Sequence, residues 1–259
     1  MRTIPVLYSF ARSGGTLVNQ LLGVHPQCLV LSEVNPAASY KPVAEQAVEW
    51  LGLVAADEEN TFSRLPYYQQ VESLHDRATE RGKHLIIRDW VTVNFLPGSA
   101  GDLTTPSGQL EQELYLERAG FVSLPLVIAR RSADVYRSIK HNFMHLQTLD
   151  MDVFAESYLV YARAVAKFPI IHLENLRSNS DKTFVEILSQ FHIETDDWKS
   201  LLRKFHNFKS CTGNTTLSIL SESAAAHEIL PPDKSVPEIT AISNIGTALA
   251  EADRLLHYV

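Results

Sequence analysis

One short segment near the N-terminus, Ser9–Leu17, combines residue types that bind an anion. It joins the apolar run Ile4–Phe10 to an amphipathic pattern that begins at Gly15, which predicts a strand, a loop and a helix in that order. Two glycines, a forked cation and two hydroxyl groups meet in this loop, at Arg12, Ser13, Gly14, Gly15 and Thr16. Backbone N–H groups and the positive end of a helix dipole would point at the same place. This chemistry predicts a site for a phosphate or a sulfate.

A second junction of the same kind lies at Leu126–Ser138. Arg130 ends an apolar run, and Ser138 lies on the helix predicted over Ala133–Leu146. An arginine at a strand end and a serine on the next helix can converge on one anion. Taken alone, this segment also fits a solvated pair, Arg130 and Arg131, beside a neutral serine.

The first segment departs from the loop of nucleotide triphosphatases, G-x-x-x-x-G-K-[ST]. With Thr16 in the last position, Gly15 stands where the lysine belongs and Ser9 where the first glycine belongs. Only Gly14 and Thr16 match, so the pattern disfavours an ATP or GTP loop. An ordinary strand-to-helix turn, with glycines for tight packing, is the other interpretation that this segment leaves open.

Together the two segments resemble the sulfotransferases that use 3'-phosphoadenosine 5'-phosphosulfate. The first segment matches their first donor-binding loop, with Gly15 in place of the usual first threonine. The second matches their 3'-phosphate motif at Arg130, Asp134, Val135 and Ser138, with Ser132 where proline is common. The resemblance implies that the donor is bound by Arg12, Ser13, Gly14, Gly15, Thr16, Leu17, Arg130 and Ser138.

The site layout is most similar to tyrosylprotein-type and bacterial sulfotransferases. Their base is a glutamate that follows a His-Pro turn, and His25-Pro26 and Glu33 match this order. The resemblance therefore implies Glu33 as the general base. Two alternatives remain, since Glu33 can cap the following helix or pair with an arginine. A histidine base, as in cytosolic sulfotransferases, is the competing assignment, although no histidine lies at an equivalent strand end.

Two arginines are candidates for stabilising charge on the transferred group. Arg12 lies in the first loop, and Arg88 stands where the tyrosylprotein enzymes carry Lys-Asp-Pro, with Trp90 in place of the proline. Both are expected to be catalytic. The alternative for Arg88 is a structural pairing with Asp89 or Glu33.

The resemblance runs from about Ile4 to Thr195 and is weaker downstream of the second site. Ile171–Leu176 is similar to the family's strand that ends in Tyr-Glu-Asp-Leu, with a structural role. The C-terminal quarter has no clear match to the family's Gly-x-x-Gly-x-x-Lys loop. Lys209–Gly213 is the candidate for that part.

The acceptor site is less defined in the sequence. An apolar pocket is a candidate at Tyr67, Tyr68, Trp90, Phe95 and the loop Pro97–Gly108, and the helix with His141 and His145 is a candidate for the same cleft. The two histidines have metal-ligand spacing, but they lack the carboxylate of an HExxH arrangement. Solvated or capping histidines are therefore favoured, and no metal is expected.

Strands and helices must position these residues, and the sequence predicts them from apolar runs that alternate with helical patterns. Strands are predicted at Ile4–Phe10, Leu29–Leu31, His84–Ile87, Leu124–Ala129 and Pro169–Leu173. Helices are predicted at about Gly15–Val24, Lys41–Ala56, Ala133–Leu146, Val153–Lys167, Asp181–Phe191 and Pro237–Tyr258. This order predicts a three-layer, P-loop-like α/β fold with a central parallel sheet of about five strands flanked by helices. Neither a repeat nor a linker interrupts it, so one domain over residues 1–259 is expected.

The composition excludes several classes of protein. The chain of 259 residues has a net charge of −7, which disfavours nonspecific nucleic-acid binding. The two cysteines, Cys28 and Cys211, form neither a disulfide framework nor a CxxC metal site. The sequence contains no stretch of about 18–20 apolar residues and no signal peptide, so a cytoplasmic protein without membrane insertion is expected.

The function implied by the resemblance is transfer of a sulfuryl group from 3'-phosphoadenosine 5'-phosphosulfate to the hydroxyl of a small molecule or peptide. The products would be a sulfate ester and 3',5'-adenosine bisphosphate. Two alternatives are kept open: a P-loop kinase of small molecules, and a nucleotide-binding regulator without catalysis.

Overall fold

A computed structural model shows five parallel strands in one sheet with the order β2-β3-β1-β5-β6. The structure describes residues 2–102, 105–194, 198–213 and 244–258. The strands of this sheet are β1 (Arg2–Ser9), β2 (Cys28–Val34), β3 (His84–Asp89), β5 (Phe121–Ala129) and β6 (Ile170–His172). All five predicted strands are therefore present, and the predicted α/β class is confirmed.

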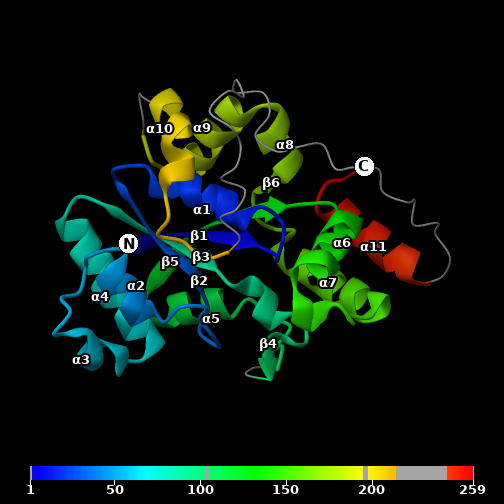
Figure 1. Ribbon diagram of the computed structural model, residues 1–259, viewed down its shortest axis with the longest axis horizontal. Coiled ribbons are helices and arrows are strands. Elements are labelled where there is room, and N and C mark those ends of the chain that lie inside the picture. Colours follow the sequence, from blue (N-terminus) through cyan, green and yellow to red (C-terminus); the bar gives the residue numbers. More distant parts are fainter. Residues whose placement is uncertain (1, 103–104, 195–197, 214–243, 259) are drawn as a thin grey trace.

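Helices cover both faces of the sheet (Figure 1). They are α1 (Gly15–Gly23), α2 (Val43–Glu49), α3 (Glu59–Ser63), α4 (Tyr67–Glu80), α5 (Glu111–Arg118), α6 (Ser132–Asn142), α7 (Met151–Val165), α8 (Leu173–Ser178), α9 (Ser180–Gln190), α10 (Trp198–Lys204) and α11 (Asn244–Leu255). Helices α1, α8, α9 and α10 lie on one side of the sheet, and α2, α4 and α5 lie on the other (Figure 1). None of the described helices is long and apolar enough to span a bilayer.

The strands are apolar on both faces because each face is covered. Leu7, Ile86 and Leu126 belong to the core under α1 and α9. Their neighbours in sequence, such as Val6 and Ile87, belong to the core shared with α2, α4 and α7. This is the pattern expected of a parallel sheet buried between two layers of helices.

Parallel pairing brings the carboxyl ends of the strands to one edge. Tyr8 lies opposite Asp89 of β3, and Ser9 lies opposite Ile128 of β5. The loops that follow Ser9, Val34, Asp89 and Ala129 therefore meet at this edge. In open α/β sheets this edge is where ligands bind.

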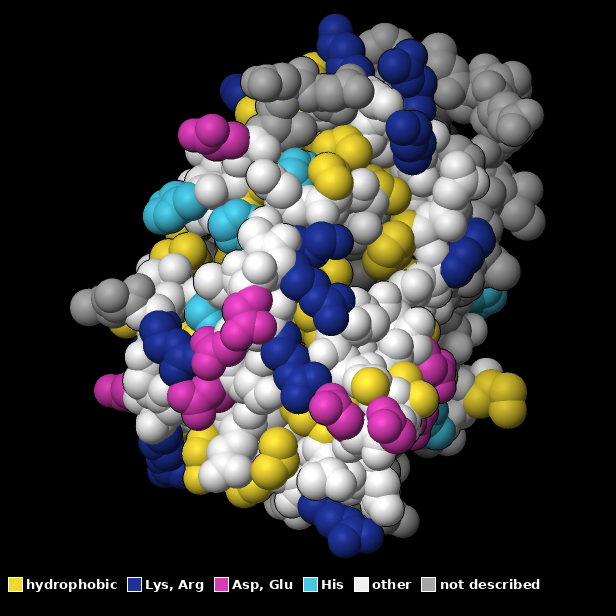
Figure 2. Space-filling model, turned by 90° about the vertical axis from the view of Figure 1, so that its left-hand side faces the viewer, with side chains coloured by type: hydrophobic (Ala, Val, Ile, Leu, Met, Phe, Trp, Pro, Cys, Tyr) yellow, Lys and Arg dark blue, Asp and Glu magenta, His cyan; other side chains and the backbone are white. Residues whose placement is uncertain are grey.

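Charges on the opposite side of the molecule pair with one another. On that face acidic and basic side chains alternate over the surface (Figure 2). Arg2 contacts Glu72 and Asp76 of α4, and Arg77 pairs with Glu58 at 2.9 Å. These exposed pairs contribute little stability, typically ~0–1 kcal/mol each.

Several element boundaries differ from those predicted. The helix predicted over Lys41–Ala56 is shorter, since α2 ends at Glu49 and Gly52 follows in a left-handed conformation with φ 59°. Helix α6 ends at Asn142 because Phe143 is extended, and a short 3-10 turn, η2 (Met144–Leu146), follows. Helices α4 and α5 were not predicted. The predicted loop Pro97–Gly108 contains a short strand, β4 (Ser99–Asp102). The last predicted helix, Pro237–Tyr258, is described only from residue 244 onward, and there it is present as α11.

Candidate functional site

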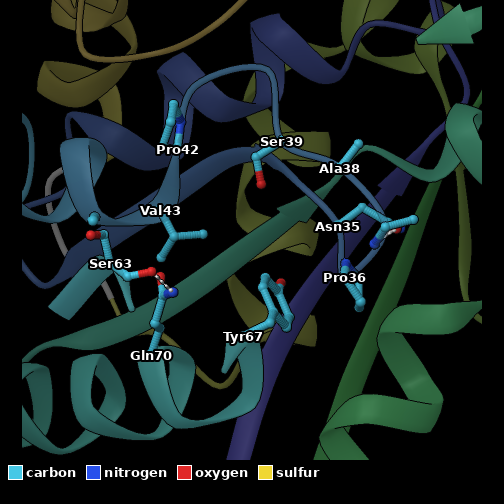
Figure 3. Close-up of a pocket in the computed structure, with 11 residues that line it drawn as sticks. Asn35, Pro36, Ala38, Ser39, Pro42, Val43, Ser63, Tyr67 and Gln70 are labelled. Carbon is cyan, nitrogen blue, oxygen red and sulfur yellow. Dashed lines mark hydrogen bonds between the residues drawn. The ribbon is translucent and has the colours of Figure 1, made fainter. Parts of the chain in front are cut away.

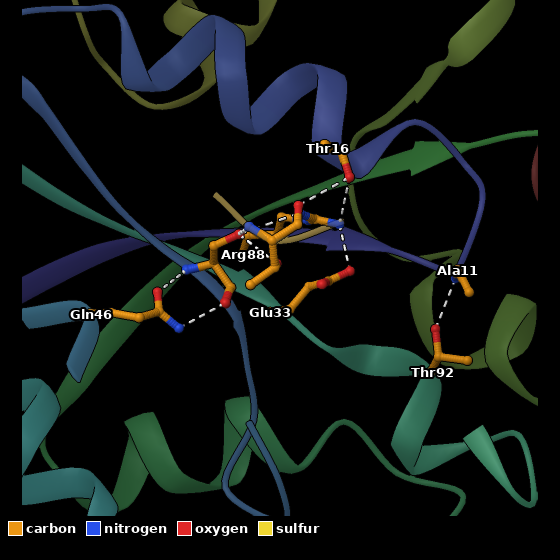
Figure 4. Close-up of polar contacts among 8 residues, drawn as sticks. Ala11, Thr16, Glu33, Gln46, Arg88 and Thr92 are labelled. Atoms are coloured by element: carbon orange, nitrogen blue, oxygen red, sulfur yellow. Dashed lines mark hydrogen bonds and ion pairs between the residues drawn. The ribbon is translucent and has the colours of Figure 1, made fainter. Parts of the chain in front are cut away.

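The loop between β1 and α1 has the shape that an anion-binding turn requires. Arg12 and Gly14 both adopt left-handed conformations, with φ 69° and 95°. The first turn of α1 lacks a side-chain cap, so its backbone N–H groups face the loop. Thr92 holds the loop from outside, because its Oγ1 accepts a hydrogen bond of 2.8 Å from the Ala11 N–H (Figure 4). Among the described residues, the buried Ser13 hydroxyl has no hydrogen-bond partner. The loop therefore presents donors to an anion.

The two predicted anion-binding segments come together at Arg12. Its Nε donates to Ser138 Oγ at 3.0 Å, and its backbone oxygen accepts from Arg130 at 3.3 Å. Arg130 is almost fully buried, and its own carbonyl accepts from Tyr158 Oη at 2.8 Å. Burial and the nearby Arg130 charge lower the pKa of Arg12, with Glu33 acting in the opposite direction. Two like charges in a partly buried site favour a bound anion.

A second cluster forms around Arg88 at the end of β3. Its guanidinium pairs with Glu33 Oε1 at 2.7 Å, and its side chain is only 6% exposed. It also donates to Thr16 Oγ1 at 3.3 Å and to Ser32 Oγ at 3.3 Å (Figure 4). Arg88 thus pairs with Glu33, one of the two alternatives named above, and not with Asp89. This contact places a carboxylate and a cation beside the first residues of α1.

The backbone of β2 turns Glu33 toward Arg88. Ser32 pairs with Arg88 of β3, and Val34 pairs with Asp89. The register of the two strands therefore shifts between Ser32 and Val34. Glu33 is the extra residue and has φ 50°, an unfavourable conformation for a residue with a side chain. A bulge of this kind redirects a side chain.

Gln46 of α2 clamps the strand just before the bulge. Its Oε1 accepts from the Ser32 N–H at 2.7 Å, and its Nε2 donates to the Ser32 carbonyl at 2.9 Å (Figure 4). All of these groups are buried. The clamp satisfies both backbone groups of Ser32 where the sheet pairing is interrupted. Sequence analysis did not find this residue, since a glutamine on a helix carries no local signal of the contact.

Arg88 also explains the unusual glycine of the first loop. A Cβ atom at Gly15 would lie 2.0 Å from Ser9 Oγ and 2.9 Å from Arg88 Nε. The threonine that the family commonly carries here would therefore collide with both side chains. Gly15 and Arg88 are a matched pair in this chain.

The candidate C-terminal segment Lys209–Gly213 reaches this cluster through Thr212. The Thr212 carbonyl accepts from Arg88 at 3.2 Å and from Thr16 Oγ1 at 3.4 Å. Its N–H donates to Ser32 Oγ at 3.0 Å. The segment thus closes the site from a distant part of the sequence. Sequence analysis named the segment but not this contact.

A buried carboxyl group lies on the other face of β3. Asp89 Oδ1 accepts a hydrogen bond of 2.8 Å from Asn35 Nδ2, which also donates to Asn94 Oδ1 at 2.8 Å. Asp89 Oδ2 has no partner among the described residues. Burial raises the pKa of Asp89 well above its usual range, and Glu113 adds to the effect while the bond from Asn35 opposes it. Asp89 therefore holds a proton more tightly than an exposed aspartate.

The remaining candidates are spread over the structure. Trp90 packs edge-on against Tyr40, and Phe95 is buried against Tyr161. Tyr67 lines a cavity beside the turn that follows β2, and Tyr68 is exposed. His141 and His145 are exposed, and the described residues contain no group of three side chains that could hold a metal ion. Leu17, predicted among the donor contacts, lies in the core under α1.

Comparison with solved structures identifies the fold. The sulfotransferase domain from the olefin synthase of Synechococcus aligns over 98% of this chain and 94% of that domain, with a TM-score of 0.59 and 15% sequence identity. The sulfotransferase domain from the curacin biosynthetic pathway aligns over 100% and 99%, with a TM-score of 0.60 and 12% identity. No model of a known protein family matches the chain, and no curated protein matches it. The chain has the fold of sulfotransferase domains, as its two motifs predict.

The buried Asp89 predicts how stability depends on pH. The unfolded chain releases this proton near pH 4, whereas the folded chain keeps it to a higher pH. The folded state then binds more protons, so the free energy of unfolding falls as pH rises, by up to about 1.4 kcal/mol per pH unit. Asp89→Asn removes this contribution. Urea unfolding from pH 5 to pH 8 should show the variant gaining stability relative to the wild type, and a constant difference would contradict the assignment.

The close approach of Gly15 to Ser9 predicts that substitutions at these two positions have coupled effects on the free energy of unfolding. Gly15→Ala should lower the free energy of unfolding by about 1–3 kcal/mol, because the new methyl group is forced against Ser9 and Arg88. Adding Ser9→Ala should recover part of this loss, with Ser9→Ala alone as the control. Equal stability of Gly15→Ala and the wild type in chemical denaturation would show that the site is not closely packed here.

Proposed function

We propose that this protein transfers a sulfuryl group from 3'-phosphoadenosine 5'-phosphosulfate to the hydroxyl group of an acceptor. The observation that carries the proposal is the convergence of two arginine-containing sites at the carboxyl edge of the sheet. One consists of Arg12, Arg130 and Ser138, and the other of Arg88, Thr16 and Glu33. This donor has two separated anionic groups, so two such sites match its charge. The fold, shared with sulfotransferase domains, supports the same reaction.

The site that contains Arg130 would hold the 3'-phosphate. Arg130 leaves the end of β5, and Ser138 lies two turns along α6. The side chain of Arg12 donates to Ser138 and therefore belongs to this site. The backbone of Arg12 belongs to the loop before α1, which forms the other site. A phosphate here would receive charge-assisted hydrogen bonds, which are stronger than neutral ones. It would also offset the repulsion between the two arginines.

The first turn of α1 would hold the 5'-phosphosulfate. Backbone N–H groups from Gly14 to Leu17, together with the Ser13 hydroxyl, are its donors. Arg88 bonds to Thr16 and so lies beside the group to be transferred. This geometry favours Arg88 over the side chain of Arg12 for stabilising charge on the sulfuryl oxygens.

Glu33 would act as the general base. Arg88 orients the carboxylate through Oε1, which leaves Oε2 for the proton of the acceptor. As the acceptor oxygen bonds to sulfur, its proton moves to Glu33 and the bond from sulfur to the phosphate oxygen breaks. The bond electrons leave with 3',5'-adenosine bisphosphate, which is already a stable anion. Cations from this chain stabilise the charge on the transferred group and the leaving group.

Glu33→Gln should separate catalysis from donor binding. The amide oxygen of glutamine can still accept from Arg88, so the geometry is retained, but the side chain cannot take a proton. Turnover should fall by about 10²–10⁴-fold, the usual contribution of a general base. The affinity for 3',5'-adenosine bisphosphate should change little. Full turnover in the variant would disprove the role of Glu33.

Arg130→Ala tests the 3'-phosphate site, and its neighbour Arg131 provides a matched control. Arg131 is exposed, and its guanidinium lies over the ring of Tyr258. Loss of a charged hydrogen bond of ~1.5–3 kcal/mol should weaken binding of 3',5'-adenosine bisphosphate about 10- to 100-fold in Arg130→Ala. Arg131→Ala removes the same charge and should change the affinity much less. Equal losses in the two variants, measured by ligand-induced thermal shift, would show only a general effect of charge.

A further inference from the structure

Two aromatic side chains meet at the end of β2, next to the proposed base. Tyr40 follows the turn after β2, and Trp90 follows the last residue of β3. Their ring centroids are 6.1 Å apart and the rings are inclined at 75°, which is an edge-to-face arrangement. Tyr40 is 69% exposed and Trp90 is half-buried. Much of the Tyr40 ring is therefore open to a ligand.

The backbone ties both residues directly to the end of β2. The Tyr40 N–H donates to the Glu33 carbonyl at 3.1 Å, and the Trp90 N–H donates to the Val34 carbonyl at 3.2 Å. Tyr40 is thus the cross-strand neighbour of Glu33 in a short hairpin, one step from the antiparallel pair of Val34 and Ser39. Residues directly opposite each other in such a pair have their side chains on the same face.

The other face of this hairpin is occupied by different residues. Val34 is buried in the core that includes residues of α2 and α4, and its partner Ser39 lines a cavity of about 290 Å³ on that side (Figure 3). Tyr40 and Trp90 belong neither to that core nor to the lining of that cavity. Their rings therefore meet on the face where Glu33 approaches the first residues of α1.

The charged groups beside the two rings are already paired. Lys41, the next residue along the chain, pairs with two glutamates of α2 at 2.9 Å each, and Glu33 pairs with Arg88 at 2.7 Å. A charged acceptor would have to compete with one of these ion pairs to gain a partner. An uncharged aromatic ring can instead stack on one of the two inclined rings and meet the other at its edge.

We propose that Tyr40 and Trp90 form an acceptor platform, which selects an uncharged molecule that carries its hydroxyl group on an aromatic ring system. This inference rests on the proposed function, and it narrows the acceptor from any small molecule or peptide to one chemical class. The acceptor ring packs on the platform. Its hydroxyl group donates to Glu33 Oε2, since Oε1 is the oxygen that contacts Arg88.

The first test compares 2-naphthol with decahydro-2-naphthol, which has the same carbon skeleton and hydroxyl position but no aromatic ring. Binding of each to the full chain saturated with 3',5'-adenosine bisphosphate is measured by saturation-transfer NMR. 2-Naphthol should bind roughly 2- to 10-fold more tightly, which is the gain expected from one aromatic pair. Equal binding, tighter binding of the saturated alcohol, or no binding of 2-naphthol would overturn the proposal.

Substitutions at the exposed Tyr40 locate the binding to the platform. Tyr40→Ala removes one of the two rings and should weaken 2-naphthol roughly 2- to 10-fold, whereas Tyr40→Phe keeps the ring and should bind as the wild type does. Tyr68→Ala is the matched control, because it removes an exposed tyrosine of α4 on the other side of the sheet (Figure 1). Wild-type affinity in Tyr40→Ala, or an equal loss in Tyr68→Ala, would overturn the proposal.

A further variant tests whether the bound hydroxyl group reaches the proposed base. 2-Methoxynaphthalene has the same rings as 2-naphthol but no hydroxyl proton, so the wild type should bind it more weakly. In Glu33→Gln the hydroxyl group donates to a neutral amide oxygen instead of a carboxylate, and such a hydrogen bond is weaker. The preference for 2-naphthol should therefore fall about fivefold. An unchanged preference would place the hydroxyl group away from Glu33 and overturn the proposal.

The donor titration separates this proposal from the one on which it rests. The Tyr40 variants should bind 3',5'-adenosine bisphosphate as the wild type does, since this side chain belongs to neither of the arginine-containing sites. Failure of the wild type to bind the bisphosphate would overturn the proposed function itself. Normal bisphosphate binding without a preference for 2-naphthol would overturn only the acceptor platform.

Discussion

The buried ion pair between Arg88 and Glu33 holds four separate parts of the chain at one point. The Arg88 guanidinium contacts the end of β2 through Glu33 and Ser32, the start of α1 through Thr16, and the C-terminal segment through Thr212. A buried pair offsets the cost of losing water only when further hydrogen bonds satisfy both ions. These contacts satisfy the two terminal nitrogens of Arg88, whereas its buried Nε has no partner among the described residues. Removing one partner of such a pair typically costs about 3–5 kcal/mol, because the other charge is left buried alone. The left-handed backbone at Glu33 accompanies this contact, and the glycine at position 15 leaves room for both Ser9 and Arg88.

The second feature of the edge is a group of neighbouring arginines within an acidic protein. The chain has a net charge of −7, and on the opposite face the exposed arginines pair with carboxylates. At the carboxyl edge, burial and the neighbouring Arg130 charge lower the pKa of Arg12. Perturbed pKa values of this kind are typical of binding sites. These local charges support the proposed anionic ligand, whereas the net charge disfavours nonspecific binding of nucleic acid.

Much of this arrangement could be predicted from the sequence because its signals are local. The five strands are short apolar runs, and the segments after Ser9 and Ala129 both carry arginine and serine at fixed offsets, with glycines in the first one only. The contacts that complete the site join residues far apart in sequence, such as Ser32 with Thr212 and Asn35 with Asp89. Neither member of these pairs has an unusual local pattern, so only the folded chain reveals them. Helix α4 was missed because its buried face is narrow, with only Val71, Leu74 and Ala78 fully enclosed.

The central claim is that the edge binds a nucleotide with separate 3' and 5' anionic groups. Calorimetric titration of the wild-type chain with 3',5'-adenosine bisphosphate, 5'-AMP and ATP–Mg²⁺ tests this claim most directly. We expect the bisphosphate to bind about 10- to 100-fold more tightly than 5'-AMP, since only the bisphosphate reaches Arg130 and Ser138. ATP–Mg²⁺ should bind more weakly than the bisphosphate, because Gly15 stands where a triphosphate loop needs its lysine. Tighter binding of ATP–Mg²⁺, or equal binding of the bisphosphate and 5'-AMP, would contradict the account.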